Sequence, residues 1–188
     1  EIFPHPAIGE WKEYTNLTSM SLDLNIGNGE YLLVPTSVAN YLKAQDDSLS
    51  VAPGGKGVPT EIRMAVRRTA DHLYTKLENS INGLKEDGTL DNLVNTYINE
   101  INTVSLEDSN LKSDETYVVG VTGDLPPMDY VSPEGNPSGF NVALMNEIAK
   151  KNGISFKFVQ VEAASRLVAL MSKKIDVVFW YGNVEGYT

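Results

Sequence analysis

The sequence predicts an α/β fold in which a parallel sheet carries helices on both faces. Residues 117–121 form an apolar run rich in β-branched residues, residues 156–161 alternate between apolar and polar, and residues 177–180 are again apolar. Apolar residues at helical spacing separate these three stretches. The connections are short, so we expect parallel strands joined by right-handed crossovers.

Two helices are predicted between these strands. The apolar residues at helical spacing in the first helix are Phe140, Leu144, Met145 and Ile148. Gly153 stands where a glycine that terminates a helix is expected. The second helix carries Leu167, Val168, Leu170, Met171 and Ile175. Before the first helix, the strand at 117–121 passes through Gly123 and Asp124 into a turn at Pro126 and Pro127, which indicates an ordered loop.

Shorter elements are predicted in residues 1–60. After an extended lead-in, residues 19–24 favour a short helix or turn and residues 31–34 a buried strand. A helix is expected at 37–43 with Ser37 as its N-cap, followed by a short strand at 49–52.

The apolar pattern of residues 61–101 predicts one strand and two amphipathic helices. Residues 61–67 alternate in character, which is typical of a strand. From Ala70 onward the apolar residues recur at helical spacing until Asp87 and Gly88, and Thr89 is the expected cap of a second helix that extends to Ile101. Core packing explains both apolar stripes.

Residues 116–182 resemble the opening lobe of type II periplasmic solute-binding proteins of the polar amino acid class, bacterial extracellular solute-binding family 3. The resemblance depends on three motifs: Pro126-Pro127-Met128 for the PPF-like turn of the family, Gly139-Phe140 with Leu144, and Lys173-Lys174-Ile175-Asp176 before the third strand. The pattern is in register over the whole stretch. It implies a periplasmic binding protein-like II fold.

Residues 28–90 resemble the other end of the same family. The stretches IRMAVR at 62–67 and LKEDGTL at 84–90 are similar to its closing signature, and residues 28–42 resemble a second-lobe strand and helix. The closing unit therefore precedes the opening unit in this chain. A circular permutation and a slice across two tandem domains both explain this order. We favour the slice, because the stretch before residue 61 is short for a complete second lobe.

The resemblance divides the chain into four segments. We expect a partial second lobe at 1–60, a closing strand and helices that pack on a first lobe at 61–101, a polar linker at 102–115, and an opening first-lobe unit at 116–188. The second and fourth segments are expected to cover the two faces of one sheet. The first segment is expected to form a smaller, incomplete α/β piece.

The resemblance also implies a small solute held between two lobes, by loops at the carboxyl ends of parallel strands. The ligand-binding candidates on these loops are Asp124, Leu125, Pro127, Met128, Tyr130, Ala163, Ser165, Trp180, Tyr181 and Asn183. Aromatic rings there would hold an apolar or cationic group, and backbone N–H groups at 163–165 would accept an anion. The alternative is that Trp180 and Tyr181 cover a lobe edge.

The sequence departs from the amino-acid binders of the family at their anchor positions. Leu125 and Ala163 stand where those proteins have aromatic residues, and Pro35 aligns with an acidic residue. No arginine follows Asp176, although the family places its carboxylate-binding arginine there. Because unpaired ligand charges are costly in a closed cleft, these departures argue against conventional recognition of an α-amino acid.

Composition excludes several other classes. The formal net charge is -10 and no block of Lys or Arg occurs, which argues against nucleic acid or an anionic membrane as partner. The chain has no cysteine, and His5 and His72 are far apart, so we expect no disulfide, metal site or cofactor. It has no apolar run of transmembrane length and no signal peptide. We expect a piece trimmed from a longer protein.

We therefore predict a non-enzymatic, extracytoplasmic solute-binding module, membrane-anchored in the full-length protein, for ABC-type uptake or signalling. One alternative is the ligand-sensing domain of a histidine kinase or diguanylate cyclase. The alternative from another class is an enzyme on the same fold, such as a dehydratase or a lytic transglycosylase. The expected partners are a small solute such as an amino acid, a membrane transporter or sensor domain, and a domain-swapped second copy.

Overall fold

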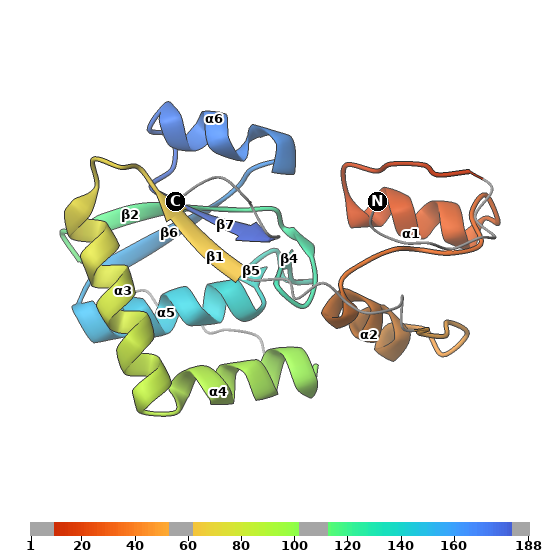
Figure 1. Ribbon diagram of the computed structural model, residues 1–188, viewed down its shortest axis with the longest axis horizontal. Coiled ribbons are helices and arrows are strands. Elements are labelled where there is room, and N and C mark those ends of the chain that lie inside the picture. Colours follow the sequence, from red (N-terminus) through yellow and green to blue (C-terminus); the bar gives the residue numbers. More distant parts are fainter. Residues whose placement is uncertain (1–9, 53–61, 102–112, 182–188) are drawn as a thin grey trace.

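The computed structural model describes residues 10–52, 62–101 and 113–181 of the 188-residue chain. Its main sheet has four strands in the order β1 (Ile62–Val66), β7 (Val177–Tyr181), β2 (Thr116–Val121) and β6 (Ser155–Gln160) (Figure 1). β2 pairs in parallel with both β6 and β7, which confirms the predicted strand direction. β1 is the predicted strand of the earlier segment, and it pairs antiparallel with β7.

The two helices predicted between the parallel strands are present, except that Ile175, predicted in the second helix, lies four residues beyond its end at Met171. α5 (Phe140–Asn152) connects β2 to β6, and α6 (Arg166–Met171) follows a short 3-10 turn at Ala163–Ser165. Gly153 has φ of 62° and is the C-cap of α5, as predicted, because glycine adopts this left-handed conformation without a Cβ clash.

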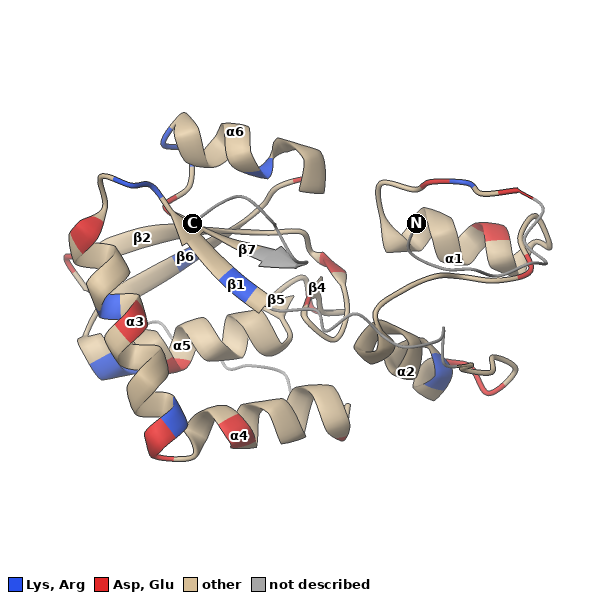
Figure 2. Ribbon diagram, viewed as in Figure 1, with Lys and Arg blue, Asp and Glu red and all other residues tan. Residues whose placement is uncertain are grey.

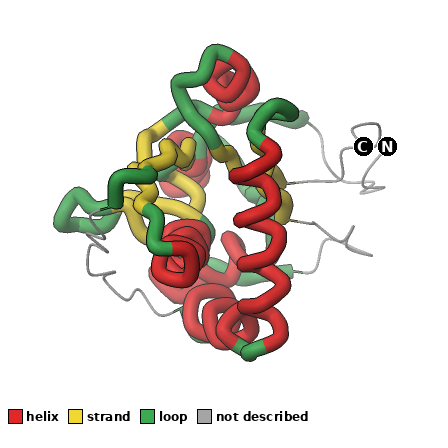
Figure 3. The backbone as a smooth tube through the Cα atoms, turned by 90° about the vertical axis from the view of Figure 1, so that its left-hand side faces the viewer, coloured by secondary structure: helices red, strands yellow, loops and turns green. Residues whose placement is uncertain are grey.

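Helices cover both faces of the sheet, as predicted (Figure 3). One face carries α3 (Asp71–Glu86), α4 (Thr89–Val94), the π-helical turn Asn95–Asn99 that continues α4, and α5. α6 packs on the other face against Ile175 and Val178.

The distribution of the helices between the faces differs from the prediction. The helices of the earlier segment share a face with α5 and do not lie opposite it. The reason lies in β1, which joins the edge of the sheet beside β7. Met64 and Val66 of β1 point to the α3 face, whereas Ala65 between them points to the α6 face.

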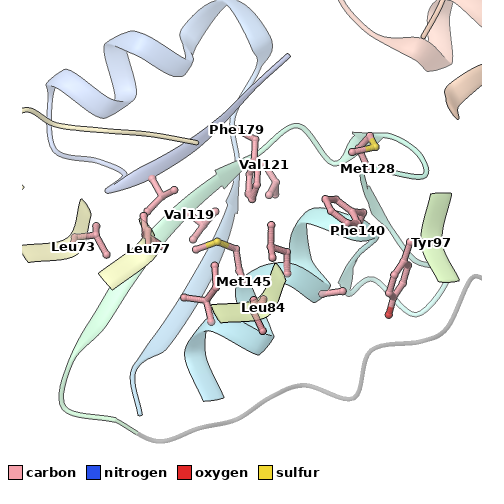
Figure 4. Packing of buried hydrophobic residues seen from close by; sticks show 14 residues of the cluster. Leu73, Leu77, Leu84, Tyr97, Val119, Val121, Met128, Phe140, Met145 and Phe179 are labelled. Atoms are coloured by element: carbon pink, nitrogen blue, oxygen red, sulfur yellow. The ribbon is translucent and has the colours of Figure 1, made fainter. Parts of the chain in front are cut away.

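The larger core cluster fills the space between α3, α5 and the sheet (Figure 4). Val119, Val177 and Phe179 from the strands are at most 2 % exposed. Met145 from α5 is fully buried among them. This packing joins residues 62–101 to residues 116–181 as one α/β lobe.

Residues 10–52 form a smaller piece with two helices, α1 (Leu17–Asn25) and α2 (Thr36–Gln45). The predicted strands at 31–34 and 49–52 are wrong, because both stretches lack a strand partner and Tyr31 is 83 % exposed. Two predicted caps are also wrong. Pro35, not Ser37, is the N-cap of α2, and Gly88, not Thr89, is the N-cap of α4.

Candidate functional site

The carboxyl ends of β2, β6 and β7, from which the loops begin, lie at one edge of the sheet, since these strands run parallel. A small antiparallel sheet of β3 (Asp124–Leu125), β4 (Asp129–Val131) and β5 (Pro137–Ser138) forms the first of these loops. The second loop contains Ala163 and Ser165, both exposed. We call this group of loops the candidate ligand edge.

The third loop begins after Tyr181, at the end of the described residues. Trp180 and Tyr181 belong to β7, opposite Arg63 and Ile62 of β1, so their backbone lies at the candidate ligand edge. Asn183 lies outside the described residues.

A buried carboxylate holds the first loop in shape. Asp129 is 1 % exposed, and its Oδ1 accepts the N–H of Thr122 at 2.7 Å, the Thr122 hydroxyl at 2.5 Å and the N–H of Gly123 at 2.9 Å. Its Oδ2 accepts from the side-chain amide of Asn141 in α5 at 2.8 Å. Sequence reasoning missed this residue. The signal was an aspartate set among apolar residues directly after the proline turn.

Pro127 and Met128 form the buried side of this loop. Both are buried, and Met128 belongs to the larger core cluster (Figure 4). The carbonyl of Pro127 accepts the N–H of Phe140 at 3.0 Å, and the carbonyl of Met128 accepts the N–H of Asn141 at 2.8 Å. The double-proline turn therefore satisfies the first N–H groups of α5. Leu125, half-buried, packs against the same cluster.

Asp124 and Tyr130 contact the N-terminal helices. The Asp124 carboxylate accepts the N–H of Thr18 at 3.1 Å and the Thr18 hydroxyl at 2.8 Å. The rings of Tyr130 and Tyr41 lie 6.1 Å apart, centroid to centroid. Burial raises the pKa of the Tyr130 phenol above its ordinary value, and the neighbouring phenols of Tyr41 and Tyr97 add to the shift.

A pocket of about 420 Å³ lies elsewhere, between β1, α3 and α4. Its lining is mostly apolar and includes Met64, Leu77, Ile81, Leu90, Phe140 and Phe179. Glu78, Asn82 and Lys85 are polar residues of α3 that also line it.

The described residues contain no group of three or more His, Asp or Glu side chains placed to bind a metal. Basic residues within the same ranges are spread over several elements (Figure 2). No helix in the described part of the chain combines the length and hydropathy needed to cross a lipid bilayer.

The architecture is an α/β lobe in which the carboxyl ends of parallel strands meet at one edge, an arrangement found in the class of periplasmic binding protein-like lobes. Within that class, residues 117–180 match the bacterial extracellular solute-binding proteins, family 3. This match confirms the resemblance predicted for that part of the chain. Comparison with curated proteins gave no match.

Solved structures similar to this chain include the arginine-bound form of domain 1 from TmArgBP, with 35 % identity and a TM-score of 0.33. The match covers 39 % of this chain and 57 % of that domain. The L-cystine solute receptor of Neisseria gonorrhoeae, in its unliganded open form, is 24 % identical with a TM-score of 0.34, over 40 % of this chain and 32 % of the receptor.

A third similar structure is a histidine kinase sensor domain with similarity to periplasmic binding proteins. It is 35 % identical with a TM-score of 0.33, over 34 % of this chain and 28 % of that one. The chain thus spans a little over half of the TmArgBP domain and about a third of the other two.

Proposed function

We propose that this chain is part of a non-enzymatic, extracytoplasmic module that captures a small solute at the candidate ligand edge. The observation that supports this best is that the carboxyl ends of β2, β6 and β7 meet at one edge, in the part of the chain that matches the solute-binding family. The proposed segments are a first lobe built from 61–101 and 116–188, a linker at 102–115, and a partial second lobe at 1–60.

The proposed ligand-binding residues divide into two groups by their positions. Asp124, Tyr130, Ala163 and Ser165 are at least partly exposed at the edge, and Trp180, Tyr181 and Asn183 come at the end of β7 or just after it. Leu125, Pro127 and Met128 lie deeper, and their proposed part is to shape the loop from beneath.

A thermal-shift screen of the full-length protein tests the proposal. The panel contains the protein amino acids, L-cystine, short oligopeptides and polyamines. A solute that binds the folded state raises Tm in a concentration-dependent way, by an amount set by its concentration relative to Kd. If no member of the panel raises Tm, the proposal is overturned.

The two tryptophans of the chain, Trp11 and Trp180, allow a matched control. Trp180→Ala is expected to weaken binding of the solute found in the screen about tenfold or more, because it removes a large contact surface at the proposed site. Trp11 is 59 % exposed in the N-terminal segment, so Trp11→Ala is expected to leave Kd unchanged. Equal effects of the two substitutions would remove Trp180 from the site.

Sensing is a second candidate role for the same binding module. It is favoured by the replacement of the amino-acid anchors of the family by Leu125, Ala163 and Pro35. A solute that binds the module and changes the output of a kinase or cyclase domain in the full-length protein would identify a sensor. A solute whose uptake into cells depends on the protein would identify a transport receptor.

A further inference from the structure

We propose that the N-terminal helical piece, α1 with α2, is a built-in cover of the candidate ligand edge and competes with solute for Asp124 and Tyr130. This inference rests on the proposed function, because it concerns regulation of the same site. It is carried by two separate contacts between residues far apart in sequence.

The first contact uses both oxygens of a carboxylate. Oδ1 of Asp124 accepts the Thr18 hydroxyl at 2.8 Å, and Oδ2 accepts the Thr18 N–H at 3.1 Å. Thr18 thereby occupies two of about four acceptor positions of this carboxylate. A cationic group of a solute that pairs with both oxygens competes with Thr18 for as long as the contact persists.

Asp124 also supplies a negative charge that the first turn of α1 lacks. The first turn of α1 contains no acidic residue, although the positive end of the helix dipole favours a negative charge there. The N-cap Asn16 accepts the N–H of Ser19, and Asp124 accepts the N–H of Thr18. Asp124 thus accepts an N–H group from the first turn of α1 and places a negative charge near the positive end of the helix dipole.

The second contact is aromatic. Tyr41 of α2 and Tyr130 of β4 face each other with a centroid separation of 6.1 Å and an interplanar angle of 42°. This tilted geometry is favourable for two aromatic rings. Burial raises the pKa of Tyr41 above its ordinary value. The cover therefore meets the candidate ligand edge at two points, one on each helix.

The cover is weakly anchored. Leu17 is the buried residue of α1 and Val38 that of α2, and neither belongs to the two core clusters of the lobe. Leu22 and Ile26 of α1 are 57 % and 60 % exposed. Because little apolar surface is buried, release of the cover requires breakage of few contacts.

Competition of this kind lowers the apparent affinity for solute by the fraction of molecules in which the edge is free. Weakening the cover is then expected to increase affinity. The test uses the double variant Thr18→Val with Tyr41→Leu, which changes residues of the cover and none of the proposed ligand-binding residues. The matched control is Thr36→Val with Tyr31→Leu, because Thr36 is exposed and Tyr31 is 83 % exposed.

The first measurement is hydrogen–deuterium exchange without solute. In the double variant we expect the backbone amides of 124–125 and 128–131 to exchange about fivefold faster, while α3 and α5 keep their protection. The control variant should exchange like the wild type. Unchanged exchange at 124–131 in the double variant would overturn the proposal that α1 and α2 cover the candidate ligand edge.

The second measurement is titration with L-arginine, which carries a cation that Asp124 would pair with. We expect the double variant to bind about fivefold more tightly than the wild type, and saturating L-arginine to increase exchange in residues 17–25 of the wild type. Increased protection of 17–25 by L-arginine would overturn competition. If no variant binds any panel solute, the proposed function fails, and exchange without solute still decides whether the cover exists.

Discussion

Nη2 of Arg67 donates to Oδ1 of Asp176 at 2.6 Å, and Oδ2 of the same carboxylate accepts the N–H of Val118 at 2.9 Å. Nη1 of Arg67 also donates to the carbonyls of Ile175 and Leu170, at 2.5 Å and 3.2 Å. Arg67 and Asp176 belong to two of the motifs on which the family resemblance depends. Their pairing joins the end of β1 to the starts of β7 and β2.

Replacement of Arg67 by methionine is expected to lower the free energy of unfolding by about 2–4 kcal/mol, because it removes the charged partner of a partly buried carboxylate and the hydrogen bonds that Arg67 donates to two carbonyls. Urea denaturation measures the change. Arg68→Met is the control, since Arg68 is exposed, and its effect should stay within about 0.5 kcal/mol. Equal effects at the two positions would contradict a structural role for the pair.

The glycine before α5 is required by crowding as well as by conformation. Gly139 has φ of 103°, and a Cβ there would lie 2.6 Å from the carbonyl oxygen of Met128. Gly135 has φ of 85° with nothing within 4 Å of its Cβ position. Gly139→Ala is expected to cost more than about 2 kcal/mol of stability and Gly135→Ala about 1 kcal/mol. The two denaturation midpoints compare these costs directly, and a larger loss at Gly135 would refute the assignment.

Substitution of Asp129 tests the loop that begins the candidate ligand edge. Asp129→Asn places an amide among backbone N–H donors, so we expect the free energy of unfolding to fall by about 2–4 kcal/mol. We also expect faster hydrogen exchange at 122–124, whose shape this carboxylate maintains. Asp47→Asn is the control, because its side chain is fully exposed. Retention of wild-type stability by the Asp129 variant would show that the carboxylate is dispensable.

The raised pKa of the Tyr117 phenol predicts that the folded state loses stability at alkaline pH. Burial and a hydrogen bond to Glu115 at 2.5 Å raise the pKa of Tyr117 to about 12 from an ordinary value of 10.0. The unfolded chain therefore loses this proton first as the pH rises. The stabilisation is fully present below pH 10 and is lost as the pH rises through about 12.

Denaturation series between neutral pH and pH 12 test this sign. Tyr117→Phe should show a shallower fall in stability above pH 10 than the wild type, because its ring carries no proton to lose. Tyr31→Phe, at a ring that is 83 % exposed, serves as the control and should follow the wild-type curve. An equally steep fall in the Tyr117 variant would assign the alkaline loss to other groups.

Much of the lobe was predictable from local patterns. The order of β2, α5, β6, α6 and β7 follows from β-branched runs, helical spacing and the terminating glycine at 153. The same reasoning failed at 31–34, where an apolar run met no partner strand. An apolar run predicts a buried strand only if another strand or helix is available to cover its apolar surface.

The candidate site was predictable only in outline. Parallel strands bring their following loops to one edge, so the loop positions followed from the element order. The contacts within the loops did not follow from the element order. Asp124, which is predicted to face a ligand, accepts hydrogen bonds from Thr18, a residue 106 positions earlier in the chain, and no local pattern indicated this contact.

The sequence by itself determined where the strands of the main sheet and the helices that cover it lie, because these properties depend on residues a few positions apart. Only the tertiary structure decided that β1 lies antiparallel beside β7, that α3 shares a face with α5, and that α1 reaches Asp124. Each of these features depends on contacts between residues far apart in the sequence. More than one element could cover the same apolar surface, and local periodicity does not indicate which one does.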